Sequence, residues 1–175
     1  LTVVASPSNQ VFTYEYDLTG RISEIQYPTD SGVVAKFSDS LDQSGWDANG
    51  QLTHLRYLKG GNLLRSFAYQ YDHSGNRKQM VDTPASGPAV TWEYSYDWLN
   101  RLSSVSKDSV LQSVCSYDES DNRIEFEMPT LSQTHTYSYD LADRLLSRSL
   151  NSSLVEPFEH DADGNMLART AGGNT

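Results

Sequence analysis

The sequence is short of the residues on which several classes of protein depend. It has one cysteine, Cys115, among 175 residues, so neither a disulfide framework nor a metal–thiolate cluster can be built from it. No run of about 18 apolar residues occurs, which leaves no candidate for a membrane-spanning helix. No Gly-rich phosphate loop, no Gly-x-Ser-x-Gly elbow and no paired metal ligands among the four histidines are found. We therefore predict no catalytic residue, no metal site and no cofactor.

Basic residues are also scarce. Lys and Arg number 13 against 23 Asp and Glu, which gives a net charge of −10 and a pI of about 4.6. A nucleic-acid partner needs clustered Lys and Arg to neutralise its phosphates, and docking on an anionic membrane needs the same. We therefore expect no nucleic-acid partner and no membrane insertion.

The sequence is rich in one seven-residue phrase, which occurs seven times at spacings of 21 to 30 residues. Each copy begins with Tyr, Trp or His, continues with Asp, and has Gly, Asn or Asp at its fifth position. An Asp side chain accepts a hydrogen bond from the backbone two residues on, which nucleates a tight turn. Gly, Asn and Asp tolerate the left-handed backbone conformation. The predicted turn residues at the second and fifth positions are Asp17, Gly20, Asp47, Gly50, Asp72, Gly75, Asp97, Asn100, Asp118, Asp121, Asp140, Asp143, Asp161 and Gly164.

Aromatic residues alternate with polar ones before most of these turns. Phe12, Tyr14 and Tyr16 share one parity, and Trp92, Tyr94 and Tyr96 repeat the pattern. Period-two alternation predicts a strand with one apolar and one wet face. Each copy is therefore interpreted as the tip of a β-hairpin. The fold class predicted is all-β, a repeat array of stacked antiparallel hairpins with about 14 strands that form a curled, spiralling sheet, or partial β-shell.

The predicted boundaries follow from this pattern. Residues 1–10 are expected to be an irregular lead-in, residues 11–170 the repeat domain and residues 171–175 a disordered tail. Val33 to Phe37 is expected to add a short strand that accounts for the longest spacing. Leu63-Leu64 and Leu145-Leu146 break the alternation, which indicates bulges or burial on both faces. Because the chain starts at Leu1 and shows no signal peptide, we expect an internal fragment of a longer protein. Neither end shows a polar capping unit, so we expect either further repeats or a partner to cover the end strands.

The phrases Tyr-Asp-x-x-Gly-Arg-Ile and Tyr-Asp-x-x-Gly-Asn-Arg resemble the YD repeats of the Rhs family, and the resemblance covers about residues 12 to 168. That family includes bacterial polymorphic toxins, insecticidal toxin-complex subunits, wall-associated proteins and the animal teneurins. The resemblance implies strands that spiral into a hollow β-shell, which in the bacterial members encloses a toxin segment released from the C-terminus of the chain. The Trp46 and His160 copies lack Tyr, and Gly is replaced at Asn100, Asp121 and Asp143. The self-cleaving aspartyl core of the family, with its Asp-Pro motif, is absent, so no proteolytic activity is carried over.

Three functions are weighed. The leading hypothesis is a non-enzymatic, secreted or surface-exposed shell segment whose partners are flanking repeats and an enclosed toxin segment. The alternative is an adhesin for a surface glycan, motivated by Trp98 at a variable turn position and more weakly by Trp46, although Trp98 could equally pack on the neighbouring turn. A polysaccharide lyase or hydrolase is disfavoured, because the acidic residues are spread too evenly to single out a catalytic pair. Residues 161–165 resemble a fragment of a calcium loop, but the distal Glu of that loop is missing.

Overall fold

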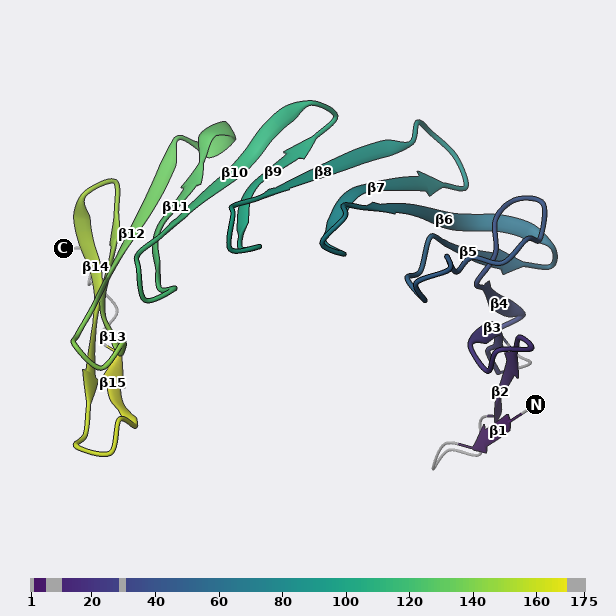
Figure 1. Ribbon diagram of the computed structural model, residues 1–175, viewed down its shortest axis with the longest axis horizontal. Helices are drawn as coiled ribbons and strands as arrows, with labels where there is room; N and C mark the ends of the chain where they lie inside the picture. The colour runs from purple at the N-terminus through teal and green to yellow at the C-terminus, as the bar shows by residue number, and fades with distance from the viewer. Residues whose placement is uncertain (1, 6–10, 29–30, 170–175) are drawn as a thin grey trace. The chain divides into compact units, whose positions relative to one another are not determined.

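The computed structural model describes residues 2–5, 11–28 and 31–169. Every strand pairs antiparallel with its neighbour, and the strand order in the sheet follows the chain from β1 to β15 (Figure 1). The all-β repeat array predicted from the sequence is confirmed. Within the described residues, no helix is long and apolar enough to cross a bilayer. The chain divides into two compact units, Leu1–Glu93 and Tyr94–Thr175, which are described separately.

The first unit is an antiparallel meander. Its strands are β1 (Thr2–Ala5), β2 (Val11–Tyr16), β3 (Ile22–Gln26), β4 (Val33–Lys36), β5 (His54–Lys59), β6 (Asn62–Tyr71), β7 (Arg77–Pro84) and the first part of β8 (Val90–Tyr96). β4 is the additional short strand expected after Tyr27. β1 pairs with β2 and lies within the segment expected to be an irregular lead-in. Its Thr-Val-Val-Ala sequence is rich in β-branched residues, which suit a strand; residues 6–10 lie outside the described residues.

The second unit continues the same pattern. Its strands are β9 (Leu102–Lys107), β10 (Val110–Tyr117), β11 (Arg123–Met128), β12 (Gln133–Tyr139), β13 (Leu145–Leu150), β14 (Ser153–His160) and β15 (Met166–Arg169). A single-turn 3₁₀ helix, η1 (Pro129–Leu131), connects β11 to β12. The tail expected at residues 171–175 lies outside the described residues.

A bulge follows the predicted turns at a constant place. Tyr16 pairs with Ile22 and Glu15 with Glu24, so Ser23 is the extra residue. The same shift leaves one extra residue in four other hairpins, at Lys78, Ile124, Leu146 and Leu167. An extra residue reverses the parity of the return strand. This is why Leu145-Leu146 does not alternate, and Leu64 is the corresponding extra residue between β5 and β6.

The hairpin turns on the opposite edge vary more. Gly60-Gly61, Asp108-Ser109 and Asn151-Ser152 are two-residue turns in which both residues have positive φ. That backbone matches the twist of the flanking strands. The β7–β8 connection runs from Ala85 to Ala89, and η1 precedes the left-handed Ser132 in the β11–β12 connection.

Neither unit has a conventional hydrophobic core among its described residues. Ala35 is the one hydrophobic residue that is buried there, and the buried polar or charged residues are Ser38, Asp82 and Glu156. The aromatic residues of the strands are mostly half-buried, because neighbouring strands cover them from the sides. The sheet is therefore stabilised by backbone hydrogen bonds and side-chain contacts between adjacent strands.

Candidate functional site

The repeated phrase forms one recurring structure, called here an Asp turn and named by its Asp, with positions one to seven counted from the residue before that Asp. In the Asp17 turn, Oδ1 of Asp17 accepts hydrogen bonds from the backbone N–H groups of Thr19 at 2.8 Å and Arg21 at 3.0 Å. The backbone N–H of Gly20 donates to the carbonyl of Asp17, and that of Asp17 donates to the carbonyl of Arg21. The four bonds recur in all seven turns.

The fifth position is left-handed in every one of these turns. The φ angles are +83° at Gly20, +78° at Gly50, +86° at Gly75, +62° at Asn100, +69° at Asp121, +58° at Asp143 and +85° at Gly164. Asn and Asp adopt this conformation more readily than other side chains because they bond to their own backbone. The second and fifth positions therefore have structural roles in the turn.

An eighth Asp turn was missed by the sequence reasoning. Residues 38–44 form it: Oδ1 of Asp39 accepts from the N–H groups of Leu41 at 2.8 Å and Gln43 at 2.9 Å, and Asp42 has a φ of +57°. Its first position is Ser38 rather than an aromatic residue, and the aromatic residue was the feature by which copies were recognised. The signal available in the sequence was an Asp followed three residues later by Asp and four later by Gln.

In four of the Asp turns the residue at the first position donates to an earlier turn. The hydroxyls of Tyr71 and Tyr117 donate to the carbonyls of Leu52 and Leu102, at 2.7 and 2.9 Å. Each acceptor is the seventh residue of the preceding turn. The Tyr139 hydroxyl donates to the carbonyl of Arg123 at 2.9 Å in the same way, and the Trp46 indole N–H donates at 2.8 Å to the carbonyl of Ile22, in the Asp17 turn. Tyr and Trp supply a hydrogen-bond donor at the far end of the ring, which Phe lacks.

The sixth position donates to the turn after it, a role that was not predicted. Nη1 of Arg101 donates to the carbonyl of Asp118 at 3.1 Å and to Oδ1 of Asp121 at 2.6 Å. Its Nε also donates to Oδ2 of Asp97 at 2.7 Å, and its guanidinium lies 4.6 Å from the centre of the Tyr117 ring. Arg21 and Arg144 make the same kind of bond, to the carbonyls of Asp47 and Asp161. The signal in the sequence was that all seven sixth positions are Arg, Gln or Asn.

In six of the Asp turns these hydrogen bonds lower the pKa of the carboxyl. At Asp140 the largest cause is the backbone N–H of Arg144, at Asp161 the side chain of Asn165 and at Asp17 the side chain of Thr19. At Asp72, Asp97 and Asp118, partial desolvation acts first and raises the pKa, but hydrogen bonds from the sixth residue and its neighbours outweigh it. The turns are therefore built around ionised carboxylates.

Trp46 and Trp98, the two candidate ligand-binding residues, have different surroundings. Trp46 is half-buried, its ring lies parallel to that of Phe37 at a centroid distance of 5.7 Å, and its indole N–H is bonded to Ile22. Trp98, at the third position of the Asp97 turn, is 86% exposed. It lines a shallow groove of about 580 Å³ with Tyr117, called here the Trp98 groove.

The Asp47 turn departs from the other six in its sixth residue. Gln51 donates from Nε2 to the carbonyl of Gly75 at 3.2 Å, instead of bonding back to its own Asp. In the other six turns the sixth side chain donates to Oδ2 of the Asp. Within the described residues, no hydrogen bond reaches Oδ2 of Asp47. Oδ2 of Asp47 is therefore available as a hydrogen-bond acceptor.

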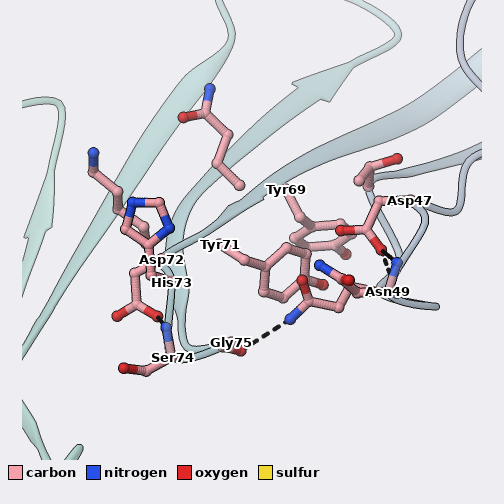
Figure 2. A pocket seen from close by; sticks show the side chains of 12 residues that line it. Asp47, Asn49, Tyr69, Tyr71, Asp72, His73, Ser74 and Gly75 are labelled. Atoms are coloured by element: carbon pink, nitrogen blue, oxygen red, sulfur yellow. Dashed lines mark hydrogen bonds between the residues drawn. The ribbon is translucent and has the colours of Figure 1, made fainter.

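A groove of about 920 Å³ lies between the Asp47 turn and the Asp72 turn, within the first unit. We call it the Tyr71 groove. Figure 2 shows the rings of Tyr69 and Tyr71 between Asp47 and Asn49 on one side and His73 on the other. Gln70 and Lys78 also line it. In the part of the chain that the structure describes, no three His, Cys, Asp or Glu side chains gather closely enough to hold a metal ion, at this groove or elsewhere.

Comparison with known proteins places the fold. No family model and no curated protein sequence matches the chain. Among solved structures, it is similar to a chain of the Photorhabdus luminescens Tc holotoxin pore carrying the mutation TccC3-D651A, with a TM-score of 0.68 and 16% identity over 94% of this chain. It is also similar to chains in the crystal structures of TcdB2-TccC3 (TM-score 0.63, 14% identity, 99% of this chain) and TcdB2-TccC3-Cdc42 (0.62, 14%, 97%). The likeness concerns the fold, and the chain spans only 9% to 11% of the length of those chains.

Proposed function

We propose that the chain is a structural segment of a secreted or surface-exposed β-shell of the YD/Rhs type, which encloses or presents another part of a longer protein. The observation that carries the proposal is the pair of hydrogen bonds between consecutive Asp turns. The first residue of one turn donates to the seventh of the turn before, and the sixth donates to the turn after. In these bonds the polar groups of the turns hold adjacent hairpins together. Joining neighbouring hairpins in this way is the role expected of a structural segment in a shell wall.

The burial pattern supports a segment that is continued on both sides. Val3 and Val4 in β1 are 57% and 49% exposed, and Met166 and Leu167 in β15 are 54% and 65% exposed. Exposed apolar strands at the two ends of a sheet are liable to pair with other strands. Flanking repeats of the same protein are the partners that fit these edges. The fold similarity to chains of a toxin assembly supports toxin delivery as the setting and an extracellular location.

Protection of an enclosed segment is the property to measure. The full-length protein is subjected to limited proteolysis, and fragments are mapped by mass spectrometry. The shell proposal expects the polypeptide outside the repeats to be protected in the wild type and to be cleaved faster in Asp140→Ala, which breaks one Asp turn. Rapid cleavage of that polypeptide in the wild type, at the rate seen after unfolding, would refute enclosure, and an electron-microscopy map without a hollow would do the same.

A glycan-binding adhesin is retained as a second candidate because of one observation. Trp98 is 86% exposed and adjoins Tyr117 in the Trp98 groove, and exposed aromatic rings stack on sugar rings. Binding to a glycan array that disappears in Trp98→Ala, with the circular-dichroism spectrum unchanged, would favour the adhesin. If neither the wild type nor Trp98→Ala binds any glycan on the array, the result would favour the shell function.

A further inference from the structure

The Tyr71 groove lies beside a turn whose sixth residue carries no guanidinium, as is also true of the Asp72, Asp118 and Asp161 turns. Between the Asp97 and Asp118 turns, the sixth residue Arg101 reaches the Asp118 carbonyl and its guanidinium lies over the Tyr117 ring. At the Asp47 turn, the uncharged Gln51 reaches the Gly75 carbonyl instead. No guanidinium from the sixth position is present here, because Gln has none. The space and the ring of Tyr71 stay accessible as part of the groove.

Two residues that line the Tyr71 groove, Tyr71 and Asn49, are held in place by hydrogen bonds. The Tyr71 hydroxyl is held by the carbonyl of Leu52 at 2.7 Å, which fixes the ring. The backbone of Asn49 is held by its bond to Oδ1 of Asp47 at 2.9 Å. A preformed site loses little conformational entropy when it binds a ligand.

The polar groups that converge on the groove are mixed in kind. Oδ2 of Asp47 is an acceptor that, within the described residues, has no hydrogen bond, whereas both carboxylate oxygens of Asp72 already accept bonds within their own turn. Asn49 supplies an amide side chain, which donates and accepts at once. Each hydroxyl group of a sugar can also donate and accept a hydrogen bond. Two neighbouring hydroxyl groups can therefore bond to a carboxylate and to an amide.

The charge around the groove favours a neutral polyhydroxylated ligand over an acidic one. Asp47, Asp72 and the ammonium group of Lys78 line the groove, the Arg77 guanidinium lies 4.7 Å from the centre of the Tyr69 ring, and the whole chain carries a net charge of −10. A sulfated, phosphorylated or sialylated ligand would be repelled by that field. An uncharged ligand with one apolar face and several hydroxyls matches both the aromatic rings and the polar rim.

We propose that the Tyr71 groove binds a neutral saccharide, with a sugar ring against Tyr71 and its hydroxyls bonded to Oδ2 of Asp47 and to the amide of Asn49. This site is separate from the Trp98 groove. The proposal goes beyond the shell function and does not depend on it, since a wall segment can bind a glycan on one surface.

The test uses the full chain on an array of neutral, sialylated and sulfated oligosaccharides, followed by titration calorimetry with the strongest neutral ligand. The variant Asn49→Ala should weaken binding about tenfold, equivalent to about 1.4 kcal/mol. Ser120→Ala is the matched control, because Ser120 occupies the same fourth position in the Asp118 turn, outside the groove. It should bind as the wild type does.

Four results would overturn the proposal. They are binding to no neutral oligosaccharide, binding confined to the acidic ligands, equal binding by the wild type and Asn49→Ala, and loss of binding in Trp98→Ala alone. Circular dichroism of each variant shows whether the fold is retained, and if a groove variant unfolds, Asn49→Ser replaces it as a milder change. The shell proposal is tested by proteolysis, so the two can fail independently.

Discussion

The hydroxyl of Tyr117 donates a hydrogen bond of 2.9 Å to the backbone carbonyl of Leu102, which is the last residue of the preceding Asp turn. The two residues are separated by 15 positions in sequence, and this bond joins one hairpin to the next. The same relationship between Tyr139 and Arg123 shows that it belongs to the repeat rather than to one hairpin.

Removing only that hydroxyl measures the bond. Tyr117→Phe should reduce the free energy of unfolding by about 0.5–1.5 kcal/mol, because a half-buried carbonyl loses its donor while the ring stays in place. Chemical denaturation followed by circular dichroism gives the value. Tyr94→Phe is the control, since the structure shows no hydrogen bond from the Tyr94 hydroxyl to any described residue. Equal losses in the two variants would contradict a role for the inter-turn bond.

The sixth position can be tested at Arg101. Arg101→Lys keeps the charge but cannot reach Asp97, Asp118 and Asp121 together, because a single ammonium group replaces the planar fork of the guanidinium. We expect a lower midpoint of thermal unfolding than that of the wild type. Gln112→Ala, which removes a bond within one strand, should change the midpoint much less. A Lys variant as stable as the wild type would show that charge alone matters at this position.

Gly45 is required for a steric reason. A Cβ at this position would lie 2.4 Å from the carbonyl oxygen of His54 and 2.6 Å from the carbonyl carbon of Phe37. Both are backbone atoms and cannot move aside, so Gly45→Ala should destabilise the protein by about 1–3 kcal/mol or more. Gly50→Asn is the control, because Asn100 already occupies the same left-handed position of another turn at a φ of +62°. Denaturation midpoints that fall equally in the two variants would refute the steric argument.

The hairpins could be predicted from the sequence because their cause is local. An Asp at the second position and Gly, Asn or Asp at the fifth determine the turn within seven residues. The inter-turn bonds could not be predicted in the same way, since Arg101 and Asp118 are 17 positions apart and the alternation of strands says nothing about which donor reaches which carbonyl. The turn at residues 38–44 was missed because Ser38 stands where the other turns have an aromatic residue. The Tyr71 groove depends on Gln51 bonding to Gly75, which only the structure reveals.

Acid should destabilise the turns. The pKa of Asp140 in the folded protein lies below its ordinary value of 3.8, first because of the backbone N–H of Arg144, and five other turn carboxyls shift in the same direction. A carboxyl with a depressed folded pKa contributes stability that is fully present above the unfolded value and is lost as pH falls through the folded value. Urea midpoints should therefore be constant between pH 7 and about 5 and fall steeply below about pH 4. Asp140→Asn should be less stable at pH 7 and lose less between pH 5 and 3. A wild-type midpoint that rises in acid would contradict the assignment.

A stabilising change is available in the β13–β14 hairpin. Ser152 has a φ of +67°, which is strained for a residue with a Cβ, whereas Gly61 occupies the equivalent place in the β5–β6 hairpin at +81°. Ser152→Gly removes strain of about 1–2 kcal/mol and costs about 0.5–1 kcal/mol in the entropy of the unfolded chain. The free energy of unfolding should therefore rise by roughly 0.5–1 kcal/mol as the net of these two terms. Asn151 must be retained, because its Oδ1 accepts the backbone N–H of Thr134 at 2.8 Å. Ser153→Gly, one residue further on at the start of β14, should be destabilising instead, so opposite signs in adjacent positions are the expected result of the denaturation measurements. Two losses of similar size would show that the turn is not strained at Ser152.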